Sequence, residues 1–271
     1  MKVLIFWDIY WRVWRNAFKK HYLEIKTKYS PDFVIVNPEN ISSGRWPTEK
    51  HILEIDALWG IDVYTSGNHI YDNIDDIRNY LDTPNSKLIR PANFYESKYV
   101  KFPGKWYKII EKSGKKLLVI NLMSSDFLRD DMYNPFLKAD EILSQFDLKE
   151  FNWIIIDFHR ESTSEIYAMS MFLDGKISFL FWTHTHIQTN DELILPLWTW
   201  LLTDVWMSGP LYSVIWADFE NIKSRFLSWV LKWKIDQSLD PNYVVSACIV
   251  EIDDKTRKCL NIEKIRIRGK L

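Results

Sequence analysis

The chain has 271 residues, and its 35 lysines and arginines nearly balance 36 aspartates and glutamates, which gives a formal net charge of −1. A chain of this length can bury the core of one large α/β domain, so we expect residues 1–271 to form a single domain. The near-neutral charge creates no overall field that would attract polyanions, which argues against an extended nucleic acid as partner and leaves a small phosphorylated ligand open.

Five short apolar runs have the composition of buried parallel strands. They cover residues 3–6, 33–37, 63–66, 153–158 and 177–182. Between and after them, apolar residues at helical spacing predict helices over 16–29, 48–58, 74–81, 135–146, 162–172 and 221–234. Further strands are expected at 106–111 and 116–122, and a hairpin at 244–252 and 259–267. The alternation of strands and helices predicts an α/β fold.

Membrane and disulfide signals are weak in this sequence. The apolar start is broken by Asp8 and is too short for a secretory signal peptide, and the apolar segment 195–202 is too short to span a bilayer. Cys248 and Cys259 are too few for a disulfide framework. We therefore expect a cytoplasmic protein with reduced thiols and no membrane partner.

Each of the five apolar runs leads into side chains that bind metals well. These side chains are Asp8, Glu39, Asn40, Asn68, His69, His159, His184 and His186. Open α/β sheets place their sites just beyond the carboxyl ends of the strands, so we expect these groups to meet. Oxygen and imidazole donors without thiolate suit Mn, Fe or Zn. Eight donors exceed the needs of one ion, and paired ions favour displacement at phosphorus.

Each candidate taken singly has a simpler explanation. Asp8 is also a normal helix cap, Asn68 and His69 fit a turn after Gly67, and His159 fits a hydrogen-bonded core histidine. Four of the six histidines, however, fall at these strand ends. That joint occurrence favours a common site over separate structural roles.

In chain order, these residues resemble the calcineurin-like metallophosphoesterase superfamily, and the chain resembles its YmdB-like family along nearly its whole length. The motifs are Asp8, Asn37-x-Glu39-Asn40, Gly67-Asn68-His69, Asp157-Phe158-His159 and Thr183-His184-Thr185-His186, with further matches at 90–94, 135–140, 163–165 and 203–205. The resemblance implies a layered α/β sandwich, in which helices flank two central, mostly parallel or mixed sheets.

The resemblance also implies a cyclic-nucleotide phosphodiesterase with two metal ions (Fe, Mn or Zn), active on 2′,3′-cyclic and to some extent 3′,5′-cyclic nucleotides. By position, Asp8, Glu39 and His186 would hold one ion with Asn40 nearby, and Glu39, Asn68, His159 and His184 the other. A metal-bridging hydroxide would attack phosphorus, and His69 would protonate the leaving oxygen or stabilise its charge. The family also implies a homo-oligomer.

Two other classes of function remain open from the sequence. One is a regulatory protein that binds a cyclic nucleotide or an RNA end at a metal site with little turnover. The other is a metal-binding scaffold whose site has decayed.

The tryptophan content departs from both average composition and the family pattern. The chain has 14 tryptophans and 8 glycines, where average usage predicts roughly 19 glycines. The family has glycine where this chain has Trp7, Trp11, Trp14, Trp46, Trp59, Trp106, Trp182, Trp198, Trp206 and Trp216. Our hypothesis is that these codons are UGA, read here as tryptophan although the source organism inserts glycine. Real tryptophans at positions 7 and 182 would crowd the neighbouring ligands.

Overall fold

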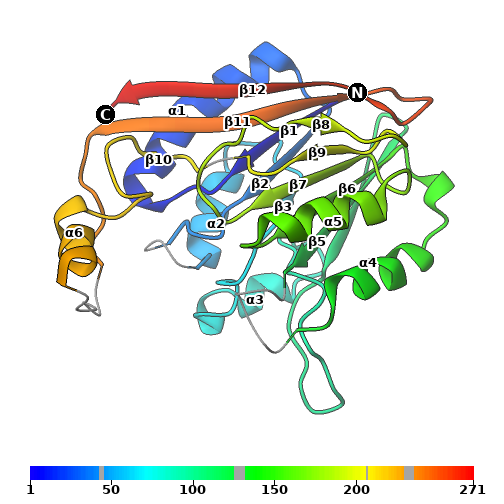
Figure 1. Ribbon diagram of the computed structural model, residues 1–271, viewed down its shortest axis with the longest axis horizontal. Coiled ribbons are helices and arrows are strands. Elements are labelled where there is room, and N and C mark those ends of the chain that lie inside the picture. Colours follow the sequence, from blue (N-terminus) through cyan, green and yellow to red (C-terminus); the bar gives the residue numbers. More distant parts are fainter. Residues whose placement is uncertain (43–45, 125–131, 206, 229–234) are drawn as a thin grey trace.

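A computed structural model describes residues 1–42, 46–124, 132–205, 207–228 and 235–271. Two mixed β-sheets lie face to face, with helices on their outer sides (Figure 1). The first sheet has the strand order β10-β11-β1-β2-β3, with β12 paired to β11, and the second has the order β4-β5-β6-β7-β9-β8. The predicted layered α/β fold is confirmed.

Each of the two sheets contains a run of parallel strands with antiparallel pairs beside it. The first contains β1 (Lys2–Trp7), β2 (Phe33–Asn37), β3 (Val63–Tyr64), β10 (Gly209–Pro210), β11 (Asn242–Ile252) and β12 (Cys259–Lys270). The second contains β4 (Tyr107–Lys112), β5 (Lys115–Met123), β6 (Trp153–His159), β7 (Phe179–Thr183), β8 (Leu193–Ile194) and β9 (Trp200–Leu202). Strands β1, β2 and β3 pair in parallel, as do β5, β6, β7 and β9.

Alternating side chains on β1 show how the layers are held together. Val3 and Ile5 pack into the core between the sheets, whereas Leu4 and Phe6 pack outward with the residues of the first helix. The helices are α1 (Trp11–Tyr29), α2 (Glu49–Asp56), α3 (Arg78–Leu81), α4 (Pro135–Ser144), α5 (Thr163–Leu173) and α6 (Phe219–Ser228). α1 and α2 contribute to the core outside the first sheet, and α4 and α5 to the core outside the second.

The helix boundaries differ from the predictions at three places. α1 begins at Trp11 rather than at position 16, because buried Trp14 continues its apolar face toward β1. The helix predicted over 74–81 divides into a 3₁₀ turn, Ile74–Asp76, and α3, because Ile77 has a non-helical φ of −132°. α6 begins at Phe219, and the last predicted part of that helix, 229–234, lies outside the described residues.

Other local predictions hold. Thr48 caps α2 by accepting a hydrogen bond from the backbone N–H of His51 at 3.3 Å, as expected. The predicted terminal hairpin is β11 and β12, paired antiparallel. Within the described ranges, none of the helices is long and apolar enough to cross a bilayer.

Candidate metal centre

The site lies where strands of both sheets end. Asp8 follows β1, Glu39 and Asn40 follow β2, and Asn68 and His69 follow β3 in the first sheet. In the second sheet, His159 is the last residue of β6, and His184 and His186 follow β7. The parallel direction of these strands brings their carboxyl ends to one rim. All eight predicted residues belong to one connected set of contacts, described below.

Asp8, Asn40 and His186 form the first part of this set. Asp8 is fully buried, and its Oδ2 accepts a hydrogen bond from Asn40 Nδ2 at 2.8 Å. The Nε2 of His186 lies 3.1 Å from the same Oδ2. Burial raises the pKa of Asp8 to about 7, although the hydrogen bonds from Asn40 oppose it. Burial lowers the pKa of His186 to about 3, so a neutral imidazole, the form that ligates metals, faces the carboxyl group.

Glu39 lies between the two parts of the site. Its Oε1 accepts a hydrogen bond from the backbone N–H of His69 at 2.8 Å, and its Oε2 lies 3.3 Å from His159 Nδ1. Burial raises the pKa of Glu39 to about 8, while the positive charge of His69 opposes the rise. Gly67 makes this approach possible, because a Cβ there would meet the His159 ring and the Glu39 carboxyl group.

Hydrogen bonds that link Asp157, Thr183 and His159 determine which ring nitrogen of His159 carries the proton. The Thr183 hydroxyl donates to Asp157 Oδ1 at 2.9 Å, so its oxygen accepts from His159 Nδ1, also at 2.9 Å. This arrangement places the imidazole proton on Nδ1 and leaves the lone pair on Nε2. Nε2 then lies 2.7 Å from Asn68 Oδ1, so two electron-pair donors face each other. A cation that both atoms ligate would resolve that repulsion.

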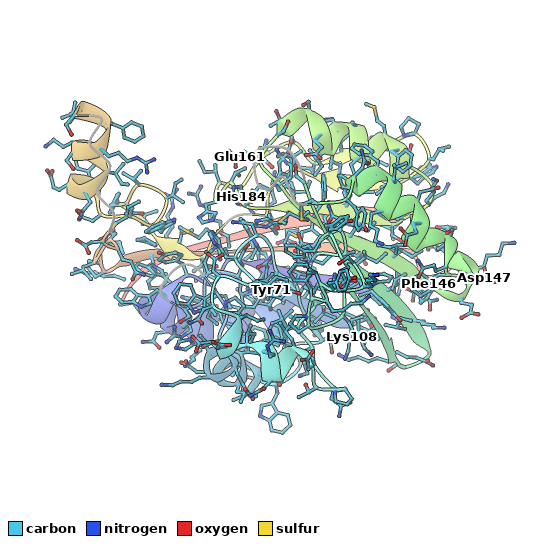
Figure 2. The ribbon with its side chains drawn as sticks, turned by 90° about the horizontal axis from the view of Figure 1, so that it is seen from below. Tyr71, Lys108, Phe146, Asp147, Glu161 and His184 are labelled. Carbon is cyan, nitrogen blue, oxygen red and sulfur yellow. The ribbon has the colours of Figure 1, made fainter. Side chains whose placement is uncertain are left out.

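His184 connects the two parts of the site. Its ring centroid lies 4.9 Å from that of His159 and 6.5 Å from that of His186. Glu161 approaches it from the segment after β6, with Oε2 2.7 Å from His184 Nε2, and Figure 2 shows the two side chains close together. His184 and His186 have φ values of 122° and 62°, so the backbone at these two residues is not extended. Both rings nevertheless reach the site.

Unlike His159, His184 and His186, His69 has a raised pKa, and it is paired with a carboxylate at the protein surface. Its Nδ1 lies 2.6 Å from Asp72 Oδ2, and about a third of its side chain is exposed. Burial lowers the pKa of His69, but the hydrogen bond to Asp72 and the charges of Glu39, Asp72 and Asp8 outweigh it, so the net shift is upward. A proton is therefore held here more firmly than on an ordinary histidine.

Sequence reasoning assigned no role to several groups that support the predicted ligands, although Asp157, Thr183 and Asp204 lie within the matched motifs. Asp157 and Thr183 hold His159, and Glu161 approaches His184. Asp204 holds the segment between the two histidines by accepting from the backbone N–H and hydroxyl of Thr185 at 3.0 and 2.6 Å. Asp157 gave one detectable signal, because an acidic residue inside an apolar strand is rarely buried without a partner.

The side chains at this site are suitable metal ligands, although their ligating atoms do not surround a common point. Among the described residues, no three His, Cys, Asp or Glu side chains already form a metal-binding group. Several ligating atoms contact one another instead, and two of them, Glu39 Oε2 and His186 Nδ1, are buried without a hydrogen-bond partner. Buried polar atoms of this kind are costly unless a further group satisfies them. Divalent cations would supply that group for the carboxylate, amide and imidazole donors.

Comparisons with known proteins agree with this geometry. The model of the family described as "YmdB-like protein" matches residues 4–265. The chain belongs to the YmdB-like family. A 2′,3′-cyclic-nucleotide 2′-phosphodiesterase from Bacillus subtilis (strain 168) is 38% identical, over 98% of this chain and 97% of that protein. The resemblance read from the motifs is thereby confirmed.

Solved structures of similar chains extend the match to the fold. A crystal structure of a novel phosphatase from Mycoplasma pneumoniae superposes with a TM-score of 0.89 at 29% identity, covering 100% of this chain and 94% of that one. A hypothetical protein from Thermus thermophilus superposes with a TM-score of 0.88 at 26% identity, covering 99% of both chains. The named members act on phosphoesters, which confirms the predicted enzyme class, the phosphoric ester hydrolases.

Two tryptophans at positions where the resemblance implies glycine are buried near the site. Trp7 is fully buried and meets the His186 ring edge-on, with centroids 5.4 Å apart. Trp182 is also fully buried, and the Arg160 guanidinium lies against its ring. Of the two, Trp7 contacts a proposed ligand.

Proposed function

We propose that the protein is a dinuclear metal-dependent phosphodiesterase that hydrolyses 2′,3′-cyclic nucleotides and, to a lesser extent, 3′,5′-cyclic nucleotides. The observation that carries the proposal is the meeting of eight oxygen and imidazole donors from five strand ends, with buried carboxyl groups whose pKa values are raised. Such perturbed, buried groups mark functional sites. The similarity to a relative named as a cyclic-nucleotide phosphodiesterase supports the choice of substrate.

In this proposal Asp8, Glu39 and His186, with Asn40 beside them, would hold one ion. Glu39, Asn68, His159 and His184 would hold the other. When bound, Fe, Mn or Zn ions lower the pKa of coordinated water and stabilise charge on phosphate oxygens. Thr183 and Asp157 keep the Nε2 lone pair of His159 available, as partners of ligating histidines commonly do.

His69 serves as the proton donor. Its Nδ1 lies 2.6 Å from Asp72 Oδ2, and the hydrogen bond to Asp72 contributes to a net upward shift of its pKa, which favours the protonated imidazole. A protonated imidazole at the rim of the site is suited to protonate the leaving oxygen or to stabilise its negative charge.

The test combines metal analysis with hydrolysis of 2′,3′-cAMP and 3′,5′-cAMP by the wild type and Glu39→Gln. We expect metal and turnover in the wild type and the loss of both in the variant. Glu150→Gln, at an exposed glutamate paired with Lys116, is the matched control and should retain both. Bound metal without turnover would support a regulatory binding protein, and absence of metal a decayed scaffold.

Three further expectations accompany this proposal. The chain is expected to fold as one domain, to act in the cytoplasm, and to form a homo-oligomer. The substrate is a small cyclic nucleotide rather than an extended nucleic acid, in keeping with the formal net charge of −1.

A further inference from the structure

A cavity of about 270 Å³ lies beside His186, outside the set of contacts described above. Its walls come from three parts of the chain. The segment after β7 contributes His186 and Ile187, the region around β10 contributes Met207, Leu211 and Ile215, and β12 contributes Arg266. The segments therefore converge on this cavity from both sheets.

We propose that this cavity binds the nucleoside part of the substrate, an inference that rests on the proposed phosphodiesterase function. His186 forms part of the cavity wall, and the Nε2 of the same imidazole lies 3.1 Å from Asp8. The cavity and the metal centre are thus separated by one side chain. A ligand that occupies both has a phosphate attached to a compact group, as a cyclic nucleotide has.

The chemistry of the walls suits a nucleobase. Ile187, Met207, Leu211 and Ile215 provide apolar surface for the faces of a planar ring, and the thioether of Met207 makes favourable contacts with aromatic groups. The guanidinium of Arg266 can stack on a base or donate hydrogen bonds to its ring nitrogen and carbonyl acceptors. The cavity volume of about 270 Å³ is slightly below the range for drug-sized ligands, which begins at about 300 Å³, so the cavity suits a compact group such as a nucleobase.

The backbone of the cavity wall gives a second observation. Ile215 has a φ of 65°, which is rare for a β-branched residue and costs conformational energy. Strain of this kind is found mainly where the surrounding structure maintains it, and it clusters at ligand-binding sites. Two larger cavities, of about 630 and 610 Å³, flank Trp11, but none of the eight site residues lines either one.

The experiment compares two substrates that differ in the nucleoside. Hydrolysis of 2′,3′-cAMP is measured beside hydrolysis of bis(p-nitrophenyl) phosphate, a diester without ribose or base. For Arg266→Ala we expect the ratio of kcat/KM values, cyclic nucleotide over synthetic diester, to fall about tenfold, the loss expected for one hydrogen bond to a charged group. Leu211→Trp, which fills the cavity, should lower the same ratio.

Arg268→Ala is the matched control, since Arg268 lies two residues further along β12 on the same side of the strand and does not line the cavity. Its ratio should equal that of the wild type. An unchanged ratio in both Arg266→Ala and Leu211→Trp, with the wild type active on both substrates, overturns the cavity proposal alone. A metal-loaded wild type that hydrolyses neither substrate overturns the phosphodiesterase function itself.

Discussion

Replacement of Asp157 by asparagine is expected to change how the stability of the metal-free protein depends on pH. Asp157 is fully buried at the end of β6, and burial raises its pKa from 3.8 to about 7. Hydrogen bonds from Thr183 and Asn37 oppose the rise, and the charge of Glu39 adds to it. Asparagine has nearly the same shape but does not titrate in this range.

The sign follows from the protons that each state binds. Between the two pKa values the folded protein keeps a proton on Asp157 that the unfolded chain has released. The free energy of unfolding therefore falls as pH rises through this window and levels off above about pH 7. One pKa unit corresponds to about 1.36 kcal/mol, so a shift of roughly three units makes this carboxyl group responsible for a loss of about 4 kcal/mol. Asp8 and Glu39, with pKa values raised to about 7 and about 8, add losses of the same sign.

Urea unfolding in the presence of a chelator, at several pH values between about 5 and 8, measures this dependence. Burial lowers the pKa values of His159, His184 and His186, and these histidines act in the opposite sense below about pH 6.5, so the test is the difference between the two proteins. The wild type should lose more stability than Asp157→Asn, or gain less, as pH rises from about 5 to about 7. Because the side-chain oxygen of asparagine can still accept from Thr183, added Mn²⁺ should stabilise Asp157→Asn much as it stabilises the wild type. Asp8→Asn should also have a weaker pH dependence but gain little from Mn²⁺.

One result would refute this reasoning. An Asp157→Asn protein with the wild-type slope would mean that Asp157 is ionised throughout this range.

The remaining predictions concern the site and the chain itself. His69→Gln should lower kcat by about 10²- to 10⁴-fold while metal content stays at the wild-type level, and loss of metal would assign the histidine a ligand role instead. Thr183→Val removes the hydroxyl between Asp157 and His159, so metal affinity measured by chelator competition should fall about 10- to 100-fold; wild-type affinity would contradict the tautomer argument. Intact-mass spectrometry of the native protein should give a mass lower than that of the printed sequence, by the difference between tryptophan and glycine at the recoded positions. A mass that matches the printed sequence would end the recoding hypothesis.

The strands and their terminal ligands could be predicted from the sequence because one physical rule governs both. Strands buried on two faces are continuous apolar runs, and their parallel carboxyl ends meet at one rim. Asp8, Glu39 and His159 could therefore be grouped although more than 100 residues separate the first from the last. His184 and His186 could be added to this group because they directly follow an apolar run, even though their backbone is not extended.

The supporting contacts could not be predicted because they depend on packing between segments. Glu161 is one of 36 acidic residues, and only the folded chain brings it to His184. The strands β8, β9 and β10 have two or three residues each, too few for a periodic pattern. The break at Ile77 likewise has no clear local signal, since isoleucine is an ordinary helix residue.

The backbone bears on the recoding hypothesis independently of composition. Trp11, Trp59 and Trp198 have φ values of 44°, 62° and 77°, a region that glycine enters freely and that other residues enter at a cost of about 1 to 3 kcal/mol each. Trp59 also exposes 81% of its surface, so packing does not compensate its strain. These three are among the positions at which the resemblance implies glycine. The composition argument counts residues and does not use backbone angles, so the two lines of support are independent.

The same substitution would change the metal centre. With tryptophan at position 7, a buried ring packs against His186. With tryptophan at position 182, an aromatic ring packs against the Arg160 guanidinium. Glycine at both positions would remove the two rings, open the rim toward solvent and free Arg160 to move toward the site. If the native chain carries glycine there, restoring both glycines in a recombinant protein should increase metal binding and turnover together. An increase in neither would mean that these rings do not obstruct the ligands.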